Sequence, residues 1–85
     1  MYEWNEIKRK ANLAKHGVDF TAIEAFAWEE ALVIPDTRKD YGEPRFLAFG
    51  PIDDRLHCLA FSVRGGSIRV ISLRKANRRE VKRYG

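Results

Sequence analysis

Two apolar segments, Leu56 to Val63 and Ser67 to Arg74, are separated in the sequence by Arg64 and a pair of glycines. Gly65 and Gly66 both tolerate positive φ, as the central residues of a tight hairpin turn require. Apolar and β-branched residues dominate both flanking segments, which is typical of strands. The sequence therefore predicts an antiparallel hairpin as the centre of the fold.

Shorter strand-like segments precede this hairpin. Ala31 to Pro35 is a short β-like run, and Arg45 to Gly50 is aromatic and apolar. The polar residues 36–44 between them predict a turn, and Pro51 to Asp54 predicts the connection into the hairpin. Together with the hairpin, these segments predict an antiparallel sheet of about four strands.

A first helix is expected near the N-terminus, after a short candidate strand at residues 2–4. Asn5 is suited to the N-cap, because its side chain can accept from the free N–H groups of the first turn. Gly17 is placed to end the helix in the left-handed conformation. Between these two residues, an apolar stripe recurs at helical spacing and consists of Ile7, Ala11 and Ala14.

Two further helices are predicted. Thr21 and Glu24 have the spacing of a capping box, which indicates a second, short helix after Phe20. Ala76 to Tyr84 is rich in helix formers and predicts a C-terminal helix. The buried stripe expected for the second helix consists of Ile23, Phe26 and Ala27.

The order of these elements indicates the α+β class. Two N-terminal helices precede an antiparallel sheet of about four strands and a C-terminal helix follows it, with the helices on one side of the sheet. A chain of 85 residues has the length of one domain, so we expect residues 1–85 to form a single domain.

Positive charge is concentrated in the last quarter of the chain. The net charge is +4, but residues 64–85 contain eight basic residues and one glutamate and therefore carry 8 − 1 = +7. The preceding 63 residues carry 4 − 7 = −3. Such an asymmetry favours a polyanionic partner, most simply RNA, over an ordinary solvated helix face. The basic residues are Arg64, Arg69, Arg74, Lys75, Arg78, Arg79, Lys82 and Arg83.

Several functional classes lack their sequence signals. His16 and His57 lie in different predicted elements without a ligand cluster, so no metal site and no cofactor is expected. The lone Cys58 lies in an apolar run, which favours a small buried residue over a nucleophile and the reducing cytoplasm as the location. No apolar run approaches the roughly 20 residues of a membrane span, and no secretory signal is evident at the N-terminus.

The strongest candidates for chemistry are arginines at or near strand ends. RNA cleavage without a metal requires deprotonation of the 2′-hydroxyl, stabilisation of the phosphorane and protonation of the leaving 5′-oxygen. The planar fork of arginine suits the second requirement, although each of these arginines could also be an ordinary edge residue. Strict alternation along a strand places Arg69 and Arg74 on opposite faces, unless twist or a bulge re-aims one of them.

Other side chains could supply the remaining steps. Lys15 and His16 end the first helix, where cations stabilise the helix dipole, and His16 can also titrate near neutral pH. From the residues alone, the dipole interpretation is preferred for both. An unpaired base could stack on an exposed aromatic ring, for which the candidates are Tyr41, Phe46 and Tyr84.

Motifs spread along nearly the whole chain carry a family resemblance. They are Trp4-Asn5-Glu6, the Lys15-His16-Gly17 segment, Arg45 before the stretch ending at Gly50, and the segment Ile68 to Ala76, followed by Glu80 and Tyr84. Together they resemble the BrnT toxins of bacterial type II toxin–antitoxin systems. The chain departs from the pattern at Leu73, where a small residue such as alanine is expected. We expect this change to alter the packing beside Arg74 and to leave the arginine in place.

The resemblance implies a RelE-like fold and a metal-independent endoribonuclease that arrests growth by cutting RNA. It further implies a BrnA-like antitoxin partner that binds operator DNA, so that a complex, expected to be a heterotetramer, represses its own promoter. The expected catalytic residues are Lys15, His16, Arg45, Arg64, Arg69, Arg74 and Glu80. The expected RNA-binding residues are Arg78, Arg79, Lys82, Arg83 and Tyr84.

Two alternatives remain open. The chain could be a non-catalytic nucleic-acid-binding module that acts only within a repressor complex. Its basic C-terminal helix could also be an interface for an acidic antitoxin rather than for RNA.

Overall fold

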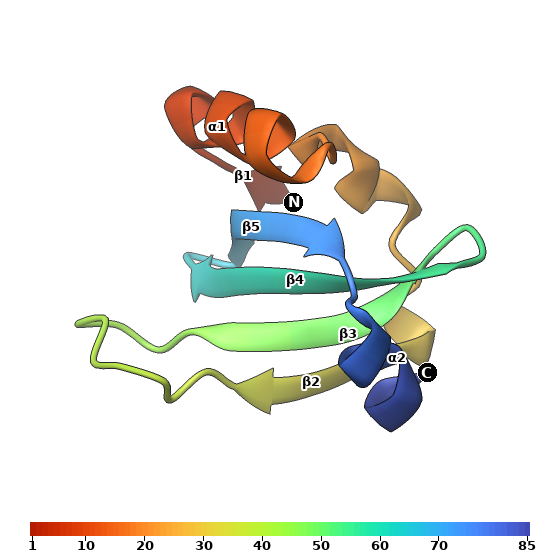
Figure 1. The fold of residues 1–85 in the computed structure, drawn as a ribbon. Helices are drawn as coiled ribbons and strands as arrows, with labels where there is room; N and C mark the ends of the chain where they lie inside the picture. Colours follow the sequence, from red (N-terminus) through yellow and green to blue (C-terminus); the bar gives the residue numbers. More distant parts are fainter.

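The predicted hairpin lies within the sheet of the structure (Figure 1). In a computed structural model, which describes residues 1–85, β4 (Arg55–Arg64) and β5 (Ser67–Lys75) pair in antiparallel register. Gly65 and Gly66 have φ values of 53° and 81°, which confirms the predicted turn. Most side chains would be strained in this left-handed conformation, which explains the two consecutive glycines.

Two more antiparallel strands extend the sheet beyond β4, as predicted. β3 (Phe46–Ile52) pairs with β4, and β2 (Leu32–Pro35) pairs with β3. β3 continues past Gly50, so the predicted connection shortens to Asp53 and Asp54. Asp53 has a φ of 54°, a conformation that aspartate tolerates better than most non-glycine residues.

A fifth strand makes the sheet mixed. β1 (Tyr2–Glu3) lies parallel to β5, and the strand order is β1-β5-β4-β3-β2. The predicted sheet of about four antiparallel strands is therefore corrected to five strands with one parallel pair. The sequence marked residues 2–4 as a candidate strand but did not predict that it joins the sheet, because a strand of two residues is too short to show an alternating pattern.

The first helix, α1 (Glu6–His16), begins and ends where the sequence predicts. The Asn5 side chain accepts from two N–H groups of the first turn, and Gly17 ends the helix with a φ of 72°. The predicted apolar stripe is wrong, because all three of its residues are exposed: Ile7, Ala11 and Ala14.

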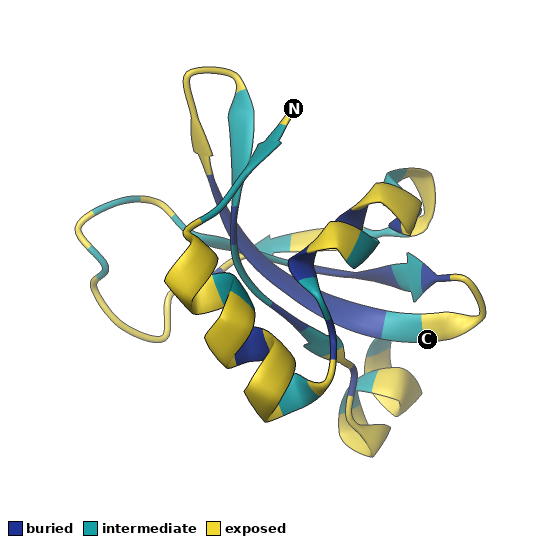
Figure 2. Cartoon of the chain, turned by 90° about the horizontal axis from the view of Figure 1, so that it is seen from above, coloured by how far each residue is buried: buried dark blue, intermediate teal, exposed yellow.

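The residue that α1 buries is Asn12, which binds the edge of β5 beyond the end of β1. Its Nδ2 donates to the carbonyl groups of Leu73 at 2.7 Å and Val18 at 2.9 Å. Its Oδ1 accepts from the Leu73 N–H at 3.2 Å. One side chain thus takes the place of a neighbouring strand at Leu73, and it forms the single dark blue band on α1 in Figure 2.

The second N-terminal helix is a 3-10 helix, η1 (Phe20–Ala25), and a 3-10 turn, η2 (Trp28–Glu30), follows it. The predicted capping box of Thr21 and Glu24 is wrong. Asp19 caps η1 instead, because its carboxylate accepts from the Thr21 N–H at 3.0 Å and is held by Arg9 at 2.9 Å. The helix therefore starts before the predicted cap.

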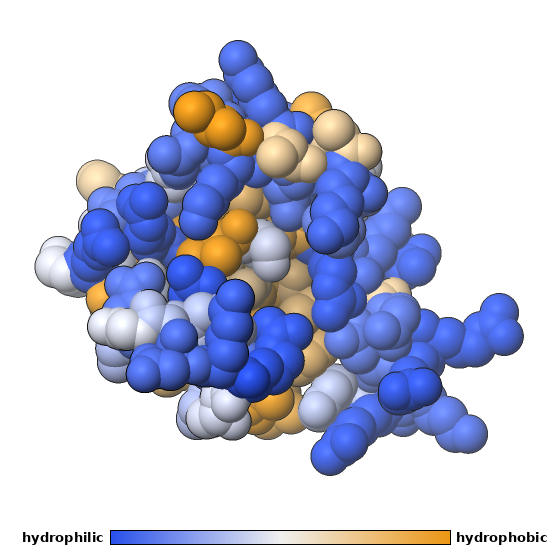
Figure 3. All heavy atoms as spheres, turned by 60° about the vertical axis from the view of Figure 1, so that its left-hand side comes forward, coloured by the Kyte–Doolittle hydropathy of each residue, from blue (hydrophilic) through white to orange (hydrophobic).

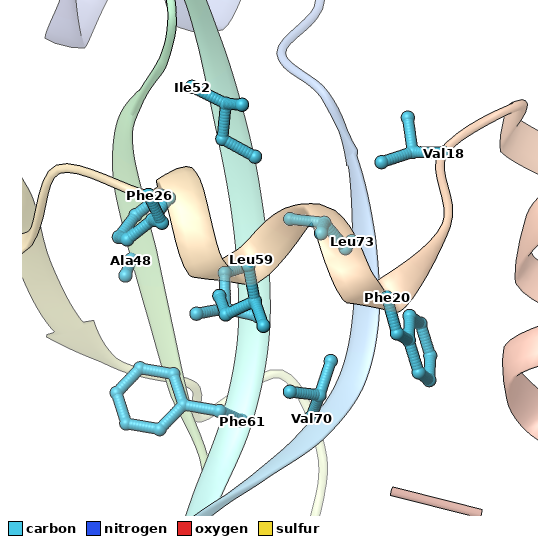
Figure 4. Close-up of a cluster of buried hydrophobic side chains, with 10 residues drawn as sticks. Val18, Phe20, Phe26, Ala48, Ile52, Leu59, Phe61, Val70 and Leu73 are labelled. Atoms are coloured by element: carbon cyan, nitrogen blue, oxygen red, sulfur yellow. The ribbon is translucent and has the colours of Figure 1, made fainter. Parts of the chain in front are cut away.

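The hydrophobic core lies between η1 and one face of the sheet, here called the core face (Figure 4). Ile23 and Phe26 are buried as predicted, although Phe26 follows the end of η1, and Phe20 joins them with no exposed surface. Ala27, the third residue of the predicted stripe, is only half-buried. The opposite face of the sheet is called the open face. The side chains that the core face contributes include Ala48, Leu59, Phe61, Val70 and Leu73.

The C-terminal helix, α2 (Arg78–Tyr84), packs on the open face, opposite η1. The Tyr84 ring stacks on Phe49 at a centroid distance of 4.2 Å, and Phe49 neighbours the core residue Ala48 in β3. The helix is shorter than predicted because Asn77 caps it in a capping box with Glu80. The α+β class is confirmed, whereas the expectation that all helices share one side of the sheet is wrong.

No helix has the length and apolar character needed to cross a membrane.

Candidate functional site

A β-bulge in β5 brings two of the predicted catalytic arginines to one face. Ala60 pairs with Ser72, but the next residue, Phe61, pairs with Val70, so one residue of β5 is left without a partner. Val70 and Leu73 are consequently both buried on the core face although they are three positions apart. The side chains of Arg69 and Arg74 then share the open face, where their partners across the ladder are Ser62 and Cys58.

Two more predicted arginines border this face, one at the end of β4 and one just before β3. Arg64 follows Ser62 by two positions and therefore shares its face. Arg45 continues the ladder with β2, since its carbonyl accepts from the Asp36 N–H at 2.8 Å. The Glu43 carboxylate lies 3.5 Å from the Arg64 guanidinium and 3.9 Å from that of Arg45. Glu43 thus links the two arginines, and it was not predicted as a site residue because it lies in the polar turn.

Arg74 is fixed by a two-pronged ion pair with Glu80. Its Nη1 and Nη2 donate to the two carboxylate oxygens at 2.7 and 2.9 Å. The Arg74 guanidinium, with help from the Asn77 N–H, holds the pKa of Glu80 below its usual value. Glu80 is therefore an ionised anchor with both oxygens engaged, which suits positioning of Arg74 better than proton transfer.

Arg69 has a looser partner in β1. Its Nη1 lies 3.6 Å from a carboxylate oxygen of Glu3, the residue opposite it in the parallel ladder. A contact at this distance is weaker than the fork of Arg74, so the Arg69 side chain is less firmly oriented.

Lys15 and His16 lie at the edge of the sheet beside the bulge. Together with Ile71 and Ser72 they line a cavity of about 220 Å³ between α1 and β5. Partial burial, followed by the charges of Lys15 and Arg74, lowers the pKa of His16 below 6.5. His16 is therefore mostly neutral at neutral pH, as a general base must be.

The predicted RNA-binding helix presents its cations to solvent but not its aromatic ring. Tyr84 is half-buried against Phe49, and the Arg83 guanidinium lies 5.6 Å from its ring centroid. The other predicted stacking residues are also engaged: Phe46 packs on Phe61, and Arg45 lies over Tyr41 at 4.1 Å. The α2 cations that remain exposed are Arg78, Arg79, Lys82 and Arg83.

One face of the molecule is recessed between hydrophilic side chains. Figure 3 shows a hollow with apolar and weakly polar residues at its floor and hydrophilic residues around it.

No group of three or more metal-ligating side chains is arranged to hold a metal ion. Cys58 is buried, and its burial raises the pKa of the thiol to about 11, so the expectation of a small buried residue is confirmed. Leu73 points into the core, on the face opposite Arg74.

The buried His57 allows a prediction of how the free energy of unfolding depends on pH. His57 is buried, its Nδ1 lies 2.8 Å from the Arg55 carbonyl, and burial lowers its pKa below 6.5. The unfolded chain therefore binds more protons than the folded chain as the pH falls through 6.5. We expect the free energy of unfolding to be constant above this pH and to fall below it, by at most about 1.4 kcal/mol per pH unit for each histidine.

Urea unfolding between pH 5 and pH 8 measures this dependence. The variant His57→Gln should have a flatter profile than the wild type, whereas the control Lys10→Gln, at an exposed position of α1, should keep the wild-type slope. Identical profiles for wild type and His57→Gln would contradict the assignment of the proton uptake to His57.

The sequence matches a known protein family over most of its length. A family model described as "Ribonuclease toxin, BrnT, of type II toxin-antitoxin system" matches residues 4–80. No curated protein matches the chain.

Proposed function

The chain belongs to the BrnT family of ribonuclease toxins of type II toxin–antitoxin systems, and from this we propose that it is a metal-independent endoribonuclease formed by a single domain, residues 1–85. The observation that carries the proposal is the bulge in β5. It supports a shared active site because Arg69 and Arg74 point to the same face as Arg64, next to the cavity that His16 lines.

In the proposed reaction, neutral His16 accepts the proton of the 2′-hydroxyl. The 2′-oxygen attacks the phosphorus, and the bond from phosphorus to the 5′-oxygen breaks, which leaves a 2′,3′-cyclic phosphate and a 5′-hydroxyl. Lys15 is the candidate that protonates the leaving 5′-oxygen. Negative charge on the phosphorane is stabilised by Arg74, whose guanidinium is already oriented by Glu80. Arg45, Arg64 and Arg69 bind the adjacent phosphates.

The exposed cations of α2 have a supporting role in this proposal. Arg78, Arg79, Lys82 and Arg83 add affinity for the RNA backbone that depends on salt but not on sequence. The same helix is a candidate surface for the antitoxin that membership of the family implies. We further propose a BrnA-like antitoxin, a heterotetrameric complex and repression of the promoter through operator DNA bound by the antitoxin.

Incubation of the purified protein with RNA at low salt, with a chelator present, tests the enzymatic function. We expect cleavage products that carry 2′,3′-cyclic phosphate and 5′-hydroxyl ends, and we expect induced expression to slow growth. RNA that stays intact although it binds the protein would favour the alternative, a nucleic-acid-binding module that acts only within a repressor complex.

A further inference from the structure

The loop between β2 and β3 is organised around one buried carboxylate. The Asp36 side chain is only 2% exposed, and it accepts hydrogen bonds from the Arg38 side chain, the Arg38 N–H and the Tyr41 hydroxyl. These bonds hold the pKa of Asp36 far below its usual value, at about 2. Tyr41 in turn lies 4.1 Å from the Arg45 guanidinium. Asp36 therefore orients one arginine directly and a second through the tyrosine ring.

Arg38 is fixed by this carboxylate and is nevertheless accessible. Its Nε and Nη2 donate to the two Asp36 oxygens, each at 2.8 Å. Its side chain is 66% exposed. The fork consumes one edge of the guanidinium, so Nη1 and the outer N–H of Nη2 remain free to donate to another anion.

The loop delivers Arg38 to the open face. Asp36 follows Pro35, whose partner in the ladder is the core-face residue Phe46, so alternation directs Asp36 to the open face beside Arg45. The Arg38 charge also helps to lower the pKa of Glu80, the partner of Arg74.

Arg38 and Arg74 share a geometry that the other arginines of this face lack. Each donates two nitrogens to both oxygens of one carboxylate within 2.9 Å, whereas Arg64 and Arg69 lie 3.5 and 3.6 Å from theirs. In each pair the guanidinium is more exposed than the carboxylate that holds it, 66% against 2% for Arg38 and Asp36 and 29% against 17% for Arg74 and Glu80, so donors of each arginine remain accessible from solvent. A preoriented guanidinium loses little conformational entropy when it binds a phosphate.

We propose that Arg38 is a further RNA-binding residue, which donates to a backbone phosphate from the loop between β2 and β3, and that Asp36 is its positioning residue. The inference rests on the proposed function, because it assigns Arg38 to the same RNA.

Salt-dependent binding provides the test. A single-stranded RNA with 2′-O-methyl groups, which cannot be cleaved, is titrated with wild type, Arg38→Ala, Arg38→Lys and Asp36→Asn at several salt concentrations. Arg55→Ala is the matched control, since Arg55 is exposed, has no ion pair and lies at the far end of β4 on the core-face side. Thermal melts verify that each variant is folded.

We expect Arg38→Ala to weaken binding about tenfold, as for a lost charge-assisted hydrogen bond, and to reduce the slope of log K against log salt by about 0.7. Arg38→Lys keeps the charge and therefore the slope, but loses affinity because lysine cannot use both carboxylate oxygens and the phosphate together. Asp36→Asn should lose affinity in the same way, and Arg55→Ala should match wild type. An Arg38→Ala slope equal to that of Arg55→Ala would overturn the proposal.

Parallel assays on unmodified RNA separate this inference from the proposed function. If wild type binds RNA with the expected slopes but never cleaves it, the enzymatic proposal fails and the role of Arg38 stands. If wild type cleaves RNA and Arg38→Ala binds and cleaves like Arg55→Ala, the enzyme stands and the role of Arg38 fails.

Discussion

Replacing Arg74 with alanine is expected to lower kcat for RNA cleavage by about 10²–10³-fold, the usual effect of removing one donor to a developing oxyanion. Arg74 is held at both carboxylate oxygens of Glu80, at 2.7 and 2.9 Å, and its charge helps to lower the pKa of His16. If the phosphorane forms beside it, the guanidinium binds the transition state more strongly than the ground state. The loss should then appear in kcat more than in affinity.

Single-turnover cleavage measures the chemical step, and binding of 2′-O-methyl RNA measures affinity separately. Lys75→Ala is the matched control, because it removes a cation from the next position of β5, which faces the other side of the sheet and is exposed. A drop in cleavage no larger than the drop in affinity would show that Arg74 only binds RNA.

A double variant that also replaces Glu80 provides a second control for Arg74→Ala. Arg74→Ala leaves the Glu80 carboxylate, which is 17% exposed, without its partner and so threatens the docking of α2. The double variant Arg74→Ala/Glu80→Ala removes the unpaired charge. If cleavage stays low in the double variant while the melting temperature recovers, the missing guanidinium is the cause of the low activity and not a displaced helix.

The strands of the hairpin could be predicted from the sequence because their signals are local. Gly65 and Gly66 define the turn by their backbone freedom, and the apolar and β-branched residues on either side indicate the two strands. The concentration of cations in residues 64–85 is likewise a property of the sequence alone. Arg64, Arg69 and Arg74 could therefore be named as candidate site residues from their positions in the chain.

The convergence of Arg69 and Arg74 could not be predicted, because it depends on packing between distant segments. Val70 and Leu73 both contact the core under η1, and the chain can bury both only by inserting an extra residue between them. The sequence of β5 does not show which of its side chains will pack under η1, and so it does not show where the bulge lies. Arg38 was missed for a related reason, since its partner Asp36 becomes buried only when the loop folds over the sheet.

The buried face of α1 was mispredicted because a periodic pattern is sought among apolar residues only, whereas the residue that α1 buries is the polar Asn12. The helix makes its most buried contact with an amide, and that contact joins residues 61 positions apart. No local pattern distinguishes such an asparagine from a solvated one. The same contact leads to the largest expected effect on stability.

Replacing Asn12 with alanine is expected to lower the free energy of unfolding by about 2–4 kcal/mol, since each buried polar group left without a partner costs about 1–3 kcal/mol. The variant leaves the N–H and C=O of Leu73 and the C=O of Val18 without Asn12, and Asn12 itself is only 7% exposed. Asn12→Asp should be at least as harmful, because a carboxylate oxygen would face two carbonyl oxygens where Nδ2 now donates. Lys10→Ala, at an exposed position of the same helix, should change stability by less than about 0.5 kcal/mol.

Urea unfolding gives these values, and a loss below about 1 kcal/mol for Asn12→Ala would show that water replaces the amide without difficulty.

The consequence for function follows from where the Asn12 amide holds the helix. Asn12 fixes α1 to β5 at Leu73, one position before Arg74, and the last turn of α1 carries Lys15 and His16. If these residues supply the proton transfers, Asn12→Ala should slow cleavage even at temperatures where the protein is fully folded, because the base is then no longer held beside the arginines. Full activity in a folded Asn12→Ala variant would instead show that cleavage does not depend on how α1 is held against β5.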